Sequence, residues 1–477
     1  MRHAALLALA LCAAGPATAQ QRGVGAVEAL GSCETDLRYL NQVIGWQLQW
    51  AESLGTLATQ PVQAQTKALA NWTNAAAGIR ADIDGLRQGM TAGRTAHPAV
   101  VDRVLAQVKA LQAQLADTPL VAEPGWRQLL EQELRPAVAA YIDFLGKVYR
   151  PRATSKSGLA SMPGGDACFA QAVTSWTTLK LSPDELEATG RSLLQEARRD
   201  LAQAAGVSEA KLPQLLAELR RETSNTSREE VLAVTQAALQ RAQQALPRWF
   251  NADQLPPIMV EPYPASIEAG AVAGAYRPAT GDASAAYVVN LSRPGERRLM
   301  AEVIAFHETL PGHHLSFSLQ KEAGRFNSGF VEGWAIYSEY LADEMKLYGT
   351  PRDRMGMHAK HLWAASRLIV EPGLHVRGWT RQQAIDFMRA NTVLSDAEIA
   401  VEVDRYLAWP GQSLAYMLGA DLIRHARARA ERGLGPKFDV RAFHDIVLRK
   451  GPRPLAQVDK DVDAWIASLS KPVARSS

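Results

Sequence analysis

The sequence predicts a mainly α-helical protein, a large helical array with a small β-sheet placed before a pair of helices that carries metal-binding side chains. Three observations support this prediction. From Gly23 to Phe250 the chain is rich in Ala, Leu, Gln and Arg, and its apolar residues recur at helical spacing. Short runs typical of strands occur between Leu255 and Pro294. A His-Glu…His group follows in the next helical segment.

The N-terminal residues have the pattern of a secretory signal peptide. Met1-Arg2-His3 precedes the apolar run Ala4 to Ala14, and residues 17–19 form a small-x-small cleavage site. A lipoprotein signal that uses Cys12 is the alternative, but Leu11 is bulky for the position before such a cysteine and the apolar run would be short. No other segment approaches the roughly 20 apolar residues of a membrane span. We therefore expect a secreted, periplasmic protein without a membrane span.

Composition limits the classes of partner. The 477 residues contain 52 Lys and Arg against 49 Asp and Glu, a formal net charge of +3. This balance gives no electrostatic reason to expect nucleic acid or an anionic membrane as a partner. After signal cleavage only Cys33 and Cys168 remain, and an oxidising compartment would permit a disulfide between them. Two unpaired buried thiols are the alternative.

The expected organisation has three parts: a signal peptide over 1–19, a helical N-terminal region over 20–254 and a catalytic region over 255–477. Helix starts are marked by capping boxes, in which an N-cap Ser or Thr is followed three residues later by Glu or Gln. These are Ser182 to Glu185, Ser227 to Glu230, Thr380 to Gln383 and Ser395 to Glu398. The sequence is therefore helical on both sides of the predicted sheet.

The sheet is expected from two β-prone runs, Ile258 to Glu261 and Ala285 to Asn290. Gly274, Pro278 and Gly281-Asp282 supply turns between them. An exposed edge of this sheet could bind an extended peptide through main-chain hydrogen bonds. An ordinary structural hairpin is the alternative, because every open sheet has edges.

The central motif runs from Phe306 to His314, with His307-Glu308 followed by two further histidines. Neutral imidazoles bind zinc, and a neighbouring carboxylate can take a proton from a zinc-bound water. In the H-E-x-x-H pattern the second histidine lies at i+4, but here that position is Pro311. On a regular helix His313 would point about 240° away from His307, and His314 would lie roughly 10 Å further along the axis. We expect Pro311 and Gly312 to bulge the helix and bring a histidine back to the metal.

A catalytic zinc site needs a third protein ligand, and the next predicted helix, Phe330 to Leu341, offers two carboxylates. Glu332 is the preferred ligand, because the intervening chain is long enough for a turn and an antiparallel second helix. Glu339 lies two turns further along the same face and could bind the metal instead. We expect Glu339 to accept a hydrogen bond from a ligand imidazole and orient it. His358, His361 and His425 lie on amphipathic helices and are interpreted as structural.

The central motif and its surroundings resemble a known family. Phe306-His307-Glu308 with Pro311-Gly312-His313-His314, then Val331 to Ala335, resembles the bacterial family DUF885, many of whose members are described as secreted or lipoprotein metallopeptidases. The likeness continues downstream over Gly373-Leu374-His375, Gly378-Trp379-Thr380, Arg405-Tyr406, Pro410-Gly411-Gln412, Tyr416 and Phe443-His444-Asp445. It covers most of the mature chain and implies a zincin-like helix pair.

The core motif is also similar to that of helical zinc carboxypeptidases and oligopeptidases, in which F-H-E-x-G-H is followed by a V-E helix. This similarity implies His313 rather than His314 as the second ligand and Glu332 as the third, although two extra residues precede Pro311 here. By the same resemblance Tyr416 is the candidate for stabilising an oxyanion. His375 is a further candidate for that role, and Arg405 is a candidate for binding substrate.

We therefore expect an exported zinc-dependent peptidase. In this interpretation His307, His313 and Glu332 hold Zn²⁺ and Glu308 is the general base. A zinc amidase for acylated or modified amino acids is one alternative, since a small amide substrate would use the same chemistry. A non-enzymatic exported binding protein with a degenerate site is the other, although ligand binding alone needs no general base beside metal ligands.

Overall fold

The computed structural model describes residues 40–156, 158–221, 226–252, 254–264, 268, 272–279, 284–321 and 327–470. The predicted signal peptide, residues 1–19, and Cys33 lie outside the described residues. The described chain is mainly helical with one small sheet, which confirms the predicted fold class. Within these residues, every helix is too short or too polar to span a lipid bilayer. Cys168 is disulfide-bonded.

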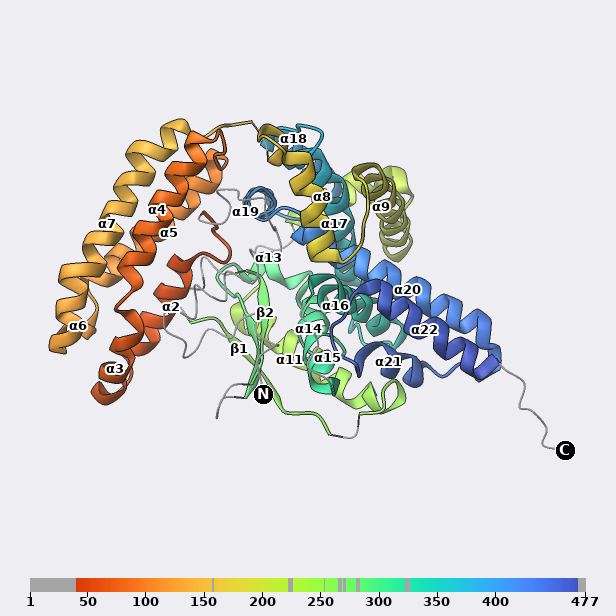
Figure 1. Ribbon diagram of the computed structural model, residues 1–477. Coiled ribbons are helices and arrows are strands. Elements are labelled where there is room, and N and C mark those ends of the chain that lie inside the picture. Colours follow the sequence, from red (N-terminus) through yellow and green to blue (C-terminus); the bar gives the residue numbers. More distant parts are fainter. Residues whose placement is uncertain are drawn as a thin grey trace.

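The first helices form one layer, drawn in red to orange at the left of Figure 1. They are α2 (Trp46–Ala58), α3 (Val62–Leu69), α4 (Ala75–Thr91), α5 (Pro98–Ala116), α6 (Pro124–Leu129) and α7 (Arg135–Phe144). A chain of indole rings runs through this layer, with centroid separations of 4.7 Å from Trp46 to Trp50, 5.2 Å from Trp50 to Trp72 and 5.9 Å from Trp72 to Trp126. Large aromatic side chains in edge-on contact provide much of the apolar burial that holds these helices together.

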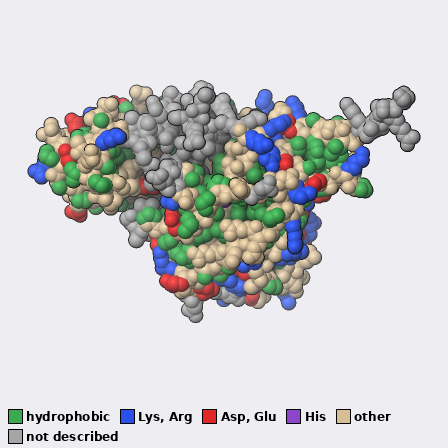
Figure 2. Space-filling view, turned by 90° about the horizontal axis from the view of Figure 1, so that it is seen from below, with side chains coloured by type: hydrophobic (Ala, Val, Ile, Leu, Met, Phe, Trp, Pro, Cys, Tyr) green, Lys and Arg blue, Asp and Glu red, His purple; other side chains and the backbone are tan. Residues whose placement is uncertain are grey.

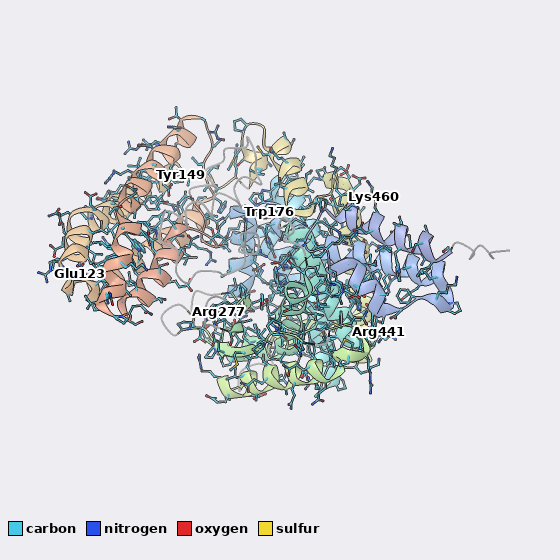
Figure 3. All side chains as sticks on the ribbon, turned by 60° about the horizontal axis from the view of Figure 1, so that its bottom comes forward. Glu123, Tyr149, Trp176, Arg277, Arg441 and Lys460 are labelled. Atoms are coloured by element: carbon cyan, nitrogen blue, oxygen red, sulfur yellow. The ribbon has the colours of Figure 1, made fainter. Side chains whose placement is uncertain are left out.

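This layer is tied to the rest of the molecule through α19 (Asp396–Ala408). The amides of Asn41 and Gln42 donate to the carbonyl oxygens of Ala408 and Asp404, and Arg103 of α5 forms an ion pair with Asp404. Figure 3 shows the extent of the molecule, with Glu123 and Tyr149 in the first layer and Arg441 and Lys460 at the opposite end. Charged side chains of both signs are interspersed on the face in Figure 2, as expected from the small net charge.

The middle helices are α8 (Gly165–Thr177), α9 (Pro183–Ala205), α10 (Leu212–Arg221) and α11 (Arg228–Ala245). They precede the predicted boundary at residue 254, but they pack against helices that follow it. Gly190 of α9 lies so close to α17 (Pro351–His375) that a β-carbon there would lie 2.7 Å from the Leu368 side chain. The helical N-terminal region and the catalytic region are therefore in direct contact through α9 and α17.

The sheet has three strands in the order β1-β3-β2, with β1 (Ile258–Pro262), β2 (Gly274–Arg277) and β3 (Ala285–Val289). β1 pairs with β3 in parallel and β2 pairs with β3 antiparallel. Both predicted strands are present, but Gly274, expected in a turn, begins the unpredicted strand β2. A β-carbon at Gly274 would lie 2.4 Å from the ring of Tyr287, so this position needs glycine to pair with β3.

The remaining helices follow the sheet and build the other half of the molecule. They are α13 (Pro294–Arg298), α14 (Ala301–Glu308), α15 (His313–Leu319), α16 (Ser328–Glu344), α17, α18 (Arg381–Asn391), α19, α20 (Ala415–Leu434), α21 (Val440–Leu448) and α22 (Leu455–Ser470). The capping boxes of Ser182, Thr380 and Ser395 are complete. Ser227 also caps α11 through its side chain, which accepts from the backbone N–H of Glu230.

Helices α16 and α20 pack very closely where they cross, because glycines stand at the contact. A β-carbon on Gly333 would lie 2.5 Å from the Cα of Gly419, and one on Gly419 would lie 2.0 Å from the carbonyl oxygen of Gly329. The helix over Phe330 to Leu341 was predicted despite Gly333, and the crossing explains why glycine stands there. It also brings Glu332 on α16 and Tyr416 at the start of α20 to the same region.

Candidate metal centre

The chain breaks helical geometry between α14 and α15. Thr309 has φ −113° and ψ −106°, Gly312 has φ −80° and ψ −129°, and the Leu310-Pro311 peptide bond is cis. A β-carbon on Gly312 would lie 1.9 Å from the carbonyl oxygen of His307, so only glycine fits. The predicted distortion at Pro311 and Gly312 is present. It separates two helices, however, rather than bulging a single one.

Hydrogen bonds hold this four-residue linker in place. The Thr309 hydroxyl donates to the carbonyl oxygen of Ala305 at 2.6 Å, and the indole N–H of Trp334 on α16 donates to the carbonyl oxygen of Pro311 at 2.9 Å. Because Trp334 belongs to the second helix of the pair, the linker and α16 are fixed relative to each other. Histidines on the two sides of the linker therefore have a defined relation to Glu332.

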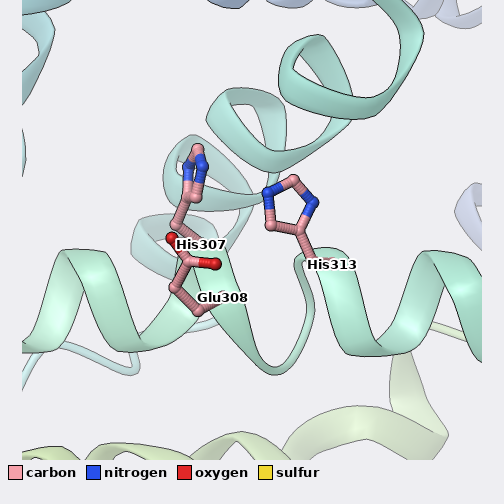
Figure 4. Close-up of side chains that lie close together, drawn as sticks. All are labelled: His307, Glu308 and His313. Carbon is pink, nitrogen blue, oxygen red and sulfur yellow. The ribbon is translucent and has the colours of Figure 1, made fainter. Parts of the chain in front are cut away.

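The two histidines and Glu332 converge. Glu332 Oε2 lies 3.4 Å from His307 Nε2 and 3.5 Å from His313 Nε2. The imidazole rings of His307 and His313 are 4.8 Å apart between centroids and nearly perpendicular, at 80°. Both histidines are buried, at 4% and 5% exposure. Figure 4 shows the imidazole groups reaching toward each other from the two sides of the linker.

The spacing of these atoms fits a tetrahedral zinc site. Zinc binds imidazole nitrogen and carboxylate oxygen at about 2.0–2.2 Å, so two ligand atoms on neighbouring corners of a tetrahedron lie roughly 3.3–3.6 Å apart. The distances of 3.4 and 3.5 Å to Glu332 lie in this range. Burial alone would raise the pKa of the Glu332 carboxyl, but its contacts with His307 and His313 outweigh burial and hold the pKa well below 4.5. The carboxylate is therefore ionised, as a metal ligand must be.

Glu308 lies beside the same atoms without taking the place of Glu332. One carboxylate oxygen of Glu308 and one nitrogen of each of His307 and His313 all lie within 4.8 Å of one another. The distances from Glu332 to the imidazole nitrogens are shorter, so Glu332 fits the position of a third ligand better than Glu308 does. Glu308 Oε2 accepts the backbone N–H of Tyr276 on β2 at 2.8 Å. Burial raises the pKa of this carboxyl, which favours its use as a proton acceptor.

Glu339 lies behind His307. His307 Nδ1 donates to Glu339 Oε1 at 2.7 Å, which leaves Nε2 free to face the other ligands. His361 Nε2 donates to Glu339 Oε2 at 3.0 Å, and the ammonium group of Lys360 also donates to this carboxylate. Glu339 is fully buried and therefore depends on these partners. This is the geometry expected for a carboxylate that orients a ligand.

Tyr416 lies on another side of His307. Its ring is stacked on the His307 ring at 6.2 Å with 14° between the planes. The guanidinium carbon of Arg367 lies 4.7 Å from the Tyr416 ring. Arg405 donates to Glu402 and, through Nη1 at 2.7 Å, to the side chain of Gln412. The predicted residues Tyr416 and Arg405 thus belong to one group of side chains next to the candidate metal centre.

His314 and His375 do not join the ligands. His314 Nε2 donates to the carbonyl oxygen of Pro256 at 2.8 Å, and the Tyr276 hydroxyl lies 3.3 Å from its Nδ1. His375 was expected to contact substrate, but both of its nitrogens are occupied elsewhere. The backbone N–H of Leu159 donates to its Nδ1 at 3.1 Å, and its Nε2 donates to the carbonyl oxygen of Tyr406 at 3.1 Å. We correct the assignment of His375 to a structural one.

Four charged or titratable side chains of this region were missed by sequence reasoning as functional candidates: Lys360, His361, Arg367 and Glu402. Lys360, His361 and Arg367 lie on α17, which is buried from Gly356 to His375 except at Trp363. Charged residues at helical spacing in a buried helix were the available signal, since such groups are rarely buried without partners. Their partners lie on other elements and could not be identified from spacing.

The comparisons with known proteins agree with the fold. A family model described as "Bacterial protein of unknown function (DUF885)" matches residues 13–462. The crystal structure of "the putative lipoprotein from Colwellia psychrerythraea" is similar with a TM-score of 0.78 and 22% identity, over 90% of this chain and 80% of that chain. A structure of "a putative lipoprotein of unknown function from Shewanella oneidensis" is similar with a TM-score of 0.65 and 15% identity, over 93% of this chain and 92% of that chain. No curated protein matches the chain.

Proposed function

The chain belongs to the DUF885 family of bacterial proteins of unknown function, and we propose that it is an exported zinc-dependent peptidase. One observation carries this proposal. His307, His313 and Glu332, which lie on three different helices, place their ligand atoms 3.4 and 3.5 Å apart around one point, with Glu308 beside them. A purely structural cluster does not require a buried, additional carboxylate next to two imidazoles and their partner carboxylate.

The chemistry follows from the positions of these side chains. Zinc held by His307, His313 and Glu332 would act as a Lewis acid and lower the pKa of a water in its open position toward 7. Glu308 accepts a proton from the attacking water and passes it to the leaving amine. The hydroxyl of Tyr416, whose ring stacks on His307, is the candidate donor to the oxyanion that develops on the carbonyl group. Glu339 keeps His307 in the orientation that this arrangement needs.

The edge of the sheet favours an extended peptide as substrate. The N–H of Tyr276 donates to Glu308 and therefore points away from β3. In an antiparallel ladder, the N–H and C=O groups of one residue point to the same side, and the side alternates along the strand. The main-chain groups of Gly274 and the carbonyl group of Tyr276 therefore lie on the outer edge of β2 next to the general base, while the Tyr276 N–H is occupied by Glu308. An extended peptide can pair with this edge while its carbonyl group lies near Glu308.

Export is part of the proposal. The pattern of residues 1–19 predicts a signal peptide, and a disulfide at Cys168 suits an oxidising compartment. The two similar solved structures are of proteins described as putative lipoproteins, which are exported proteins. We therefore propose a periplasmic location for the mature chain.

The test combines metal content with cleavage. The purified protein is expected to contain about one zinc ion per chain, measured by mass spectrometry of the metal, and to cleave members of a mixed peptide library. Glu308→Gln should retain zinc and lose activity by a factor of about 10² to 10⁴ or more, because the base is removed and the ligands are spared. Hydrolysis by Glu308→Gln at the wild-type rate would contradict the role of Glu308.

The same experiment separates the alternatives. An amidase for acylated amino acids would leave unmodified peptides intact and hydrolyse the acylated compounds. A binding protein would cleave neither, with or without zinc. A zinc-loaded protein that leaves both classes of substrate intact would therefore overturn the proposed hydrolase.

A further inference from the structure

Two guanidinium groups share one carboxylate next to the candidate metal centre. Arg367 Nη2 and Arg405 Nη2 both donate to Glu402 Oε2, at 3.2 and 3.0 Å. The side chains of the two arginines are 6% and 10% exposed, and that of Glu402 is 15% exposed. We call these three residues the arginine cluster. Its two cations and one anion leave an excess positive charge in a buried position, where an unbalanced charge is costly.

Glu371 interacts electrostatically with Arg405, but its hydrogen bonds go to other groups. Glu371 accepts the backbone N–H of Gly411 at 2.9 Å and the hydroxyl of Ser413 at 2.7 Å. Burial raises the pKa of Glu371 to about 7, so that this carboxyl is only partly ionised at neutral pH. The arginine cluster therefore retains a positive charge that an external anion can balance.

The guanidinium group of Arg367 retains donors for such an anion. Arg367 uses Nε for the hydroxyl of Tyr406 and Nη2 for Glu402, and its Nη1 has no hydrogen-bond partner among the described residues. A guanidinium group carries five N–H donors in a planar fork that matches the two oxygens of a carboxylate. Arg367 is thus suited to hold a carboxylate more strongly than a neutral group, and Arg405, whose three nitrogens already have partners, adds positive charge beside it.

The distance from the candidate metal centre suits a short piece of peptide. The Tyr416 ring lies 6.2 Å from the His307 ring and 4.7 Å from the guanidinium carbon of Arg367. These separations place the guanidinium no more than about 11 Å from His307, whereas an extended peptide advances about 3.3–3.6 Å per residue. After the contact distances at the two ends are allowed for, one or two residues fit between the cleaved bond and the arginine cluster.

We propose that Arg367 and Arg405 bind a substrate carboxylate one or two residues beyond the cleaved bond, so that the protein removes short pieces from the free carboxyl end of peptides. This inference rests on the proposed hydrolytic function. The carboxylate could be the terminal one or that of an acidic side chain at the same distance, and the two sources share one chemistry. The terminal carboxylate is the source that makes the protein an exopeptidase.

The first experiment compares three N-blocked peptides of equal length: the free acid, its C-terminal amide, and an amide whose last residue is Glu. The wild type is expected to cleave the free acid with a kcat/KM about 10- to 100-fold above that of the plain amide, the range for a charge-assisted hydrogen-bonded pair. Cleavage of the Glu amide at the rate of the free acid would assign the subsite to an acidic side chain and overturn the exopeptidase. Equal cleavage of all three would overturn the subsite.

Variants test whether the arginine cluster causes the preference. Arg367→Gln and Arg405→Gln should lower the preference for the free acid toward one, mainly by raising KM for the acid. Arg427→Gln is the matched control, because Arg427 is also a little-exposed arginine that donates to a glutamate and to a tyrosine hydroxyl. This control should keep the preference. If the arginine variants kept it while losing thermal stability, the cluster would be structural only and the proposal would fail.

A binding measurement separates this inference from the proposed function. Metal-stripped protein is titrated by calorimetry with N-acetyl-L-phenylalanine and with its amide, so that no carboxylate can bind to zinc. Tighter binding of the acid, lost in Arg367→Gln and kept in Arg427→Gln, supports the subsite even if no peptide is cleaved, in which case only the proposed function fails. Peptide cleavage without any difference between acid and amide supports the function and rejects the subsite.

Discussion

The choice between the adjacent histidines His313 and His314 can be tested residue by residue. His313 Nε2 lies 3.5 Å from Glu332, whereas His314 Nε2 donates to a backbone carbonyl. His313→Ala should therefore lose zinc at equilibrium with about one equivalent of metal, while His314→Ala retains it. Both variants remove an almost completely buried imidazole, so each serves as the stability control for the other. Zinc retention by His313→Ala together with loss by His314→Ala would exchange their roles.

A substitution at Glu339 tests the residue that orients His307 rather than a proposed metal ligand itself. Its carboxylate accepts from His307, Lys360 and His361, and the amide in Glu339→Gln keeps the shape but removes the charge. We expect this variant to bind zinc about 10- to 100-fold more weakly, the usual range for a partner of a metal-bound histidine. Glu332→Gln should weaken zinc binding by more.

The measurement is competition with a chelator of known zinc affinity. Glu344→Gln, at the C-terminal end of the same helix and in contact with Arg427, is the control and should bind zinc as the wild type does. An unchanged zinc affinity in Glu339→Gln would show that the orientation of His307 does not depend on Glu339.

The sequence was sufficient to identify most of the side chains near the candidate metal centre, but not the residues from other helices that contact them. His307, Glu308 and Glu332 stand out because their spacing and residue types suit one kind of chemistry. Lys360 and Arg367 lie on a different helix, and only the packing of α17 against α14 and α20 brings them near. His375 shows the opposite error, since a histidine within a recognisable motif proved to hold the backbone of Leu159 and Tyr406.

At the scale of elements, the crossing of α16 and α20 depends on glycine. A β-carbon at Gly333 would lie 2.5 Å from the Cα of Gly419, so Gly333→Ala must push the helices apart. We expect a loss of about 1–3 kcal/mol in the free energy of unfolding, the usual cost of overpacking. Zinc binding should weaken too, because Glu332 is the neighbouring residue.

The control for this substitution is Gly146→Ala, where the new β-carbon would lie 4.0 Å from Leu105, an ordinary contact. Since alanine favours helical backbone over glycine, this variant should be as stable as the wild type or slightly more so. Chemical denaturation measures both variants. Equal stability of the two would show that the crossing has room for a methyl group.

The buried carboxyl of Glu371, which contacts the segment that leads into α20, should make the stability of the protein depend on pH. Its carboxylate accepts from Gly411 and Ser413, and burial raises its pKa in the folded protein to about 7 from 4.5. The folded state therefore binds more protons than the unfolded state between these two values, and stability from this group falls as pH rises through that window. The full effect is roughly 2–4 kcal/mol for a shift of this size.

The comparison that isolates this effect is with Glu371→Gln, which does not titrate. Relative to the wild type, the variant should gain stability steadily from about pH 4.5 to about pH 7 and then remain level. Unfolding in urea at several pH values measures the difference. A difference that is constant over this range would mean that Glu371 is ionised throughout.

At the scale of the whole molecule, helical periodicity and capping residues predicted the fold class because both are local properties. The complete capping boxes at Ser182, Thr380 and Ser395 need only neighbouring residues. Strand β2 was not predicted because glycine is typical of turns, and Gly274 was therefore assigned to one. The strand conformation of β2 depends on its pairing with β3. The packing of α9 against α17 likewise depends on contacts between residues far apart in the sequence, and the local spacing of residue types does not indicate such contacts.

The last prediction concerns export of the protein and oxidation of its cysteines, which are properties of the entire mature chain. Cys168 is disulfide-bonded, and Cys12 and Cys33 are the other cysteines of the sequence, both outside the described residues. If cleavage follows Ala19, Cys33 is the one cysteine left to pair with Cys168. The protein isolated from the periplasm should then begin at Gln20 and contain no free thiol, whereas Cys33→Ser should expose one, measured by thiol labelling and intact mass.

The lipoprotein alternative gives different results in the same experiment. Lipid attachment at Cys12 would leave the chain in the membrane fraction with an acylated first residue, and Cys12→Ser would block maturation. With cleavage after Ala19, Cys12→Ser has no effect, whereas Ala19→Leu prevents processing because the site requires a small residue. The mass of the mature N-terminus therefore decides between a free periplasmic protein and one that is tethered to the membrane.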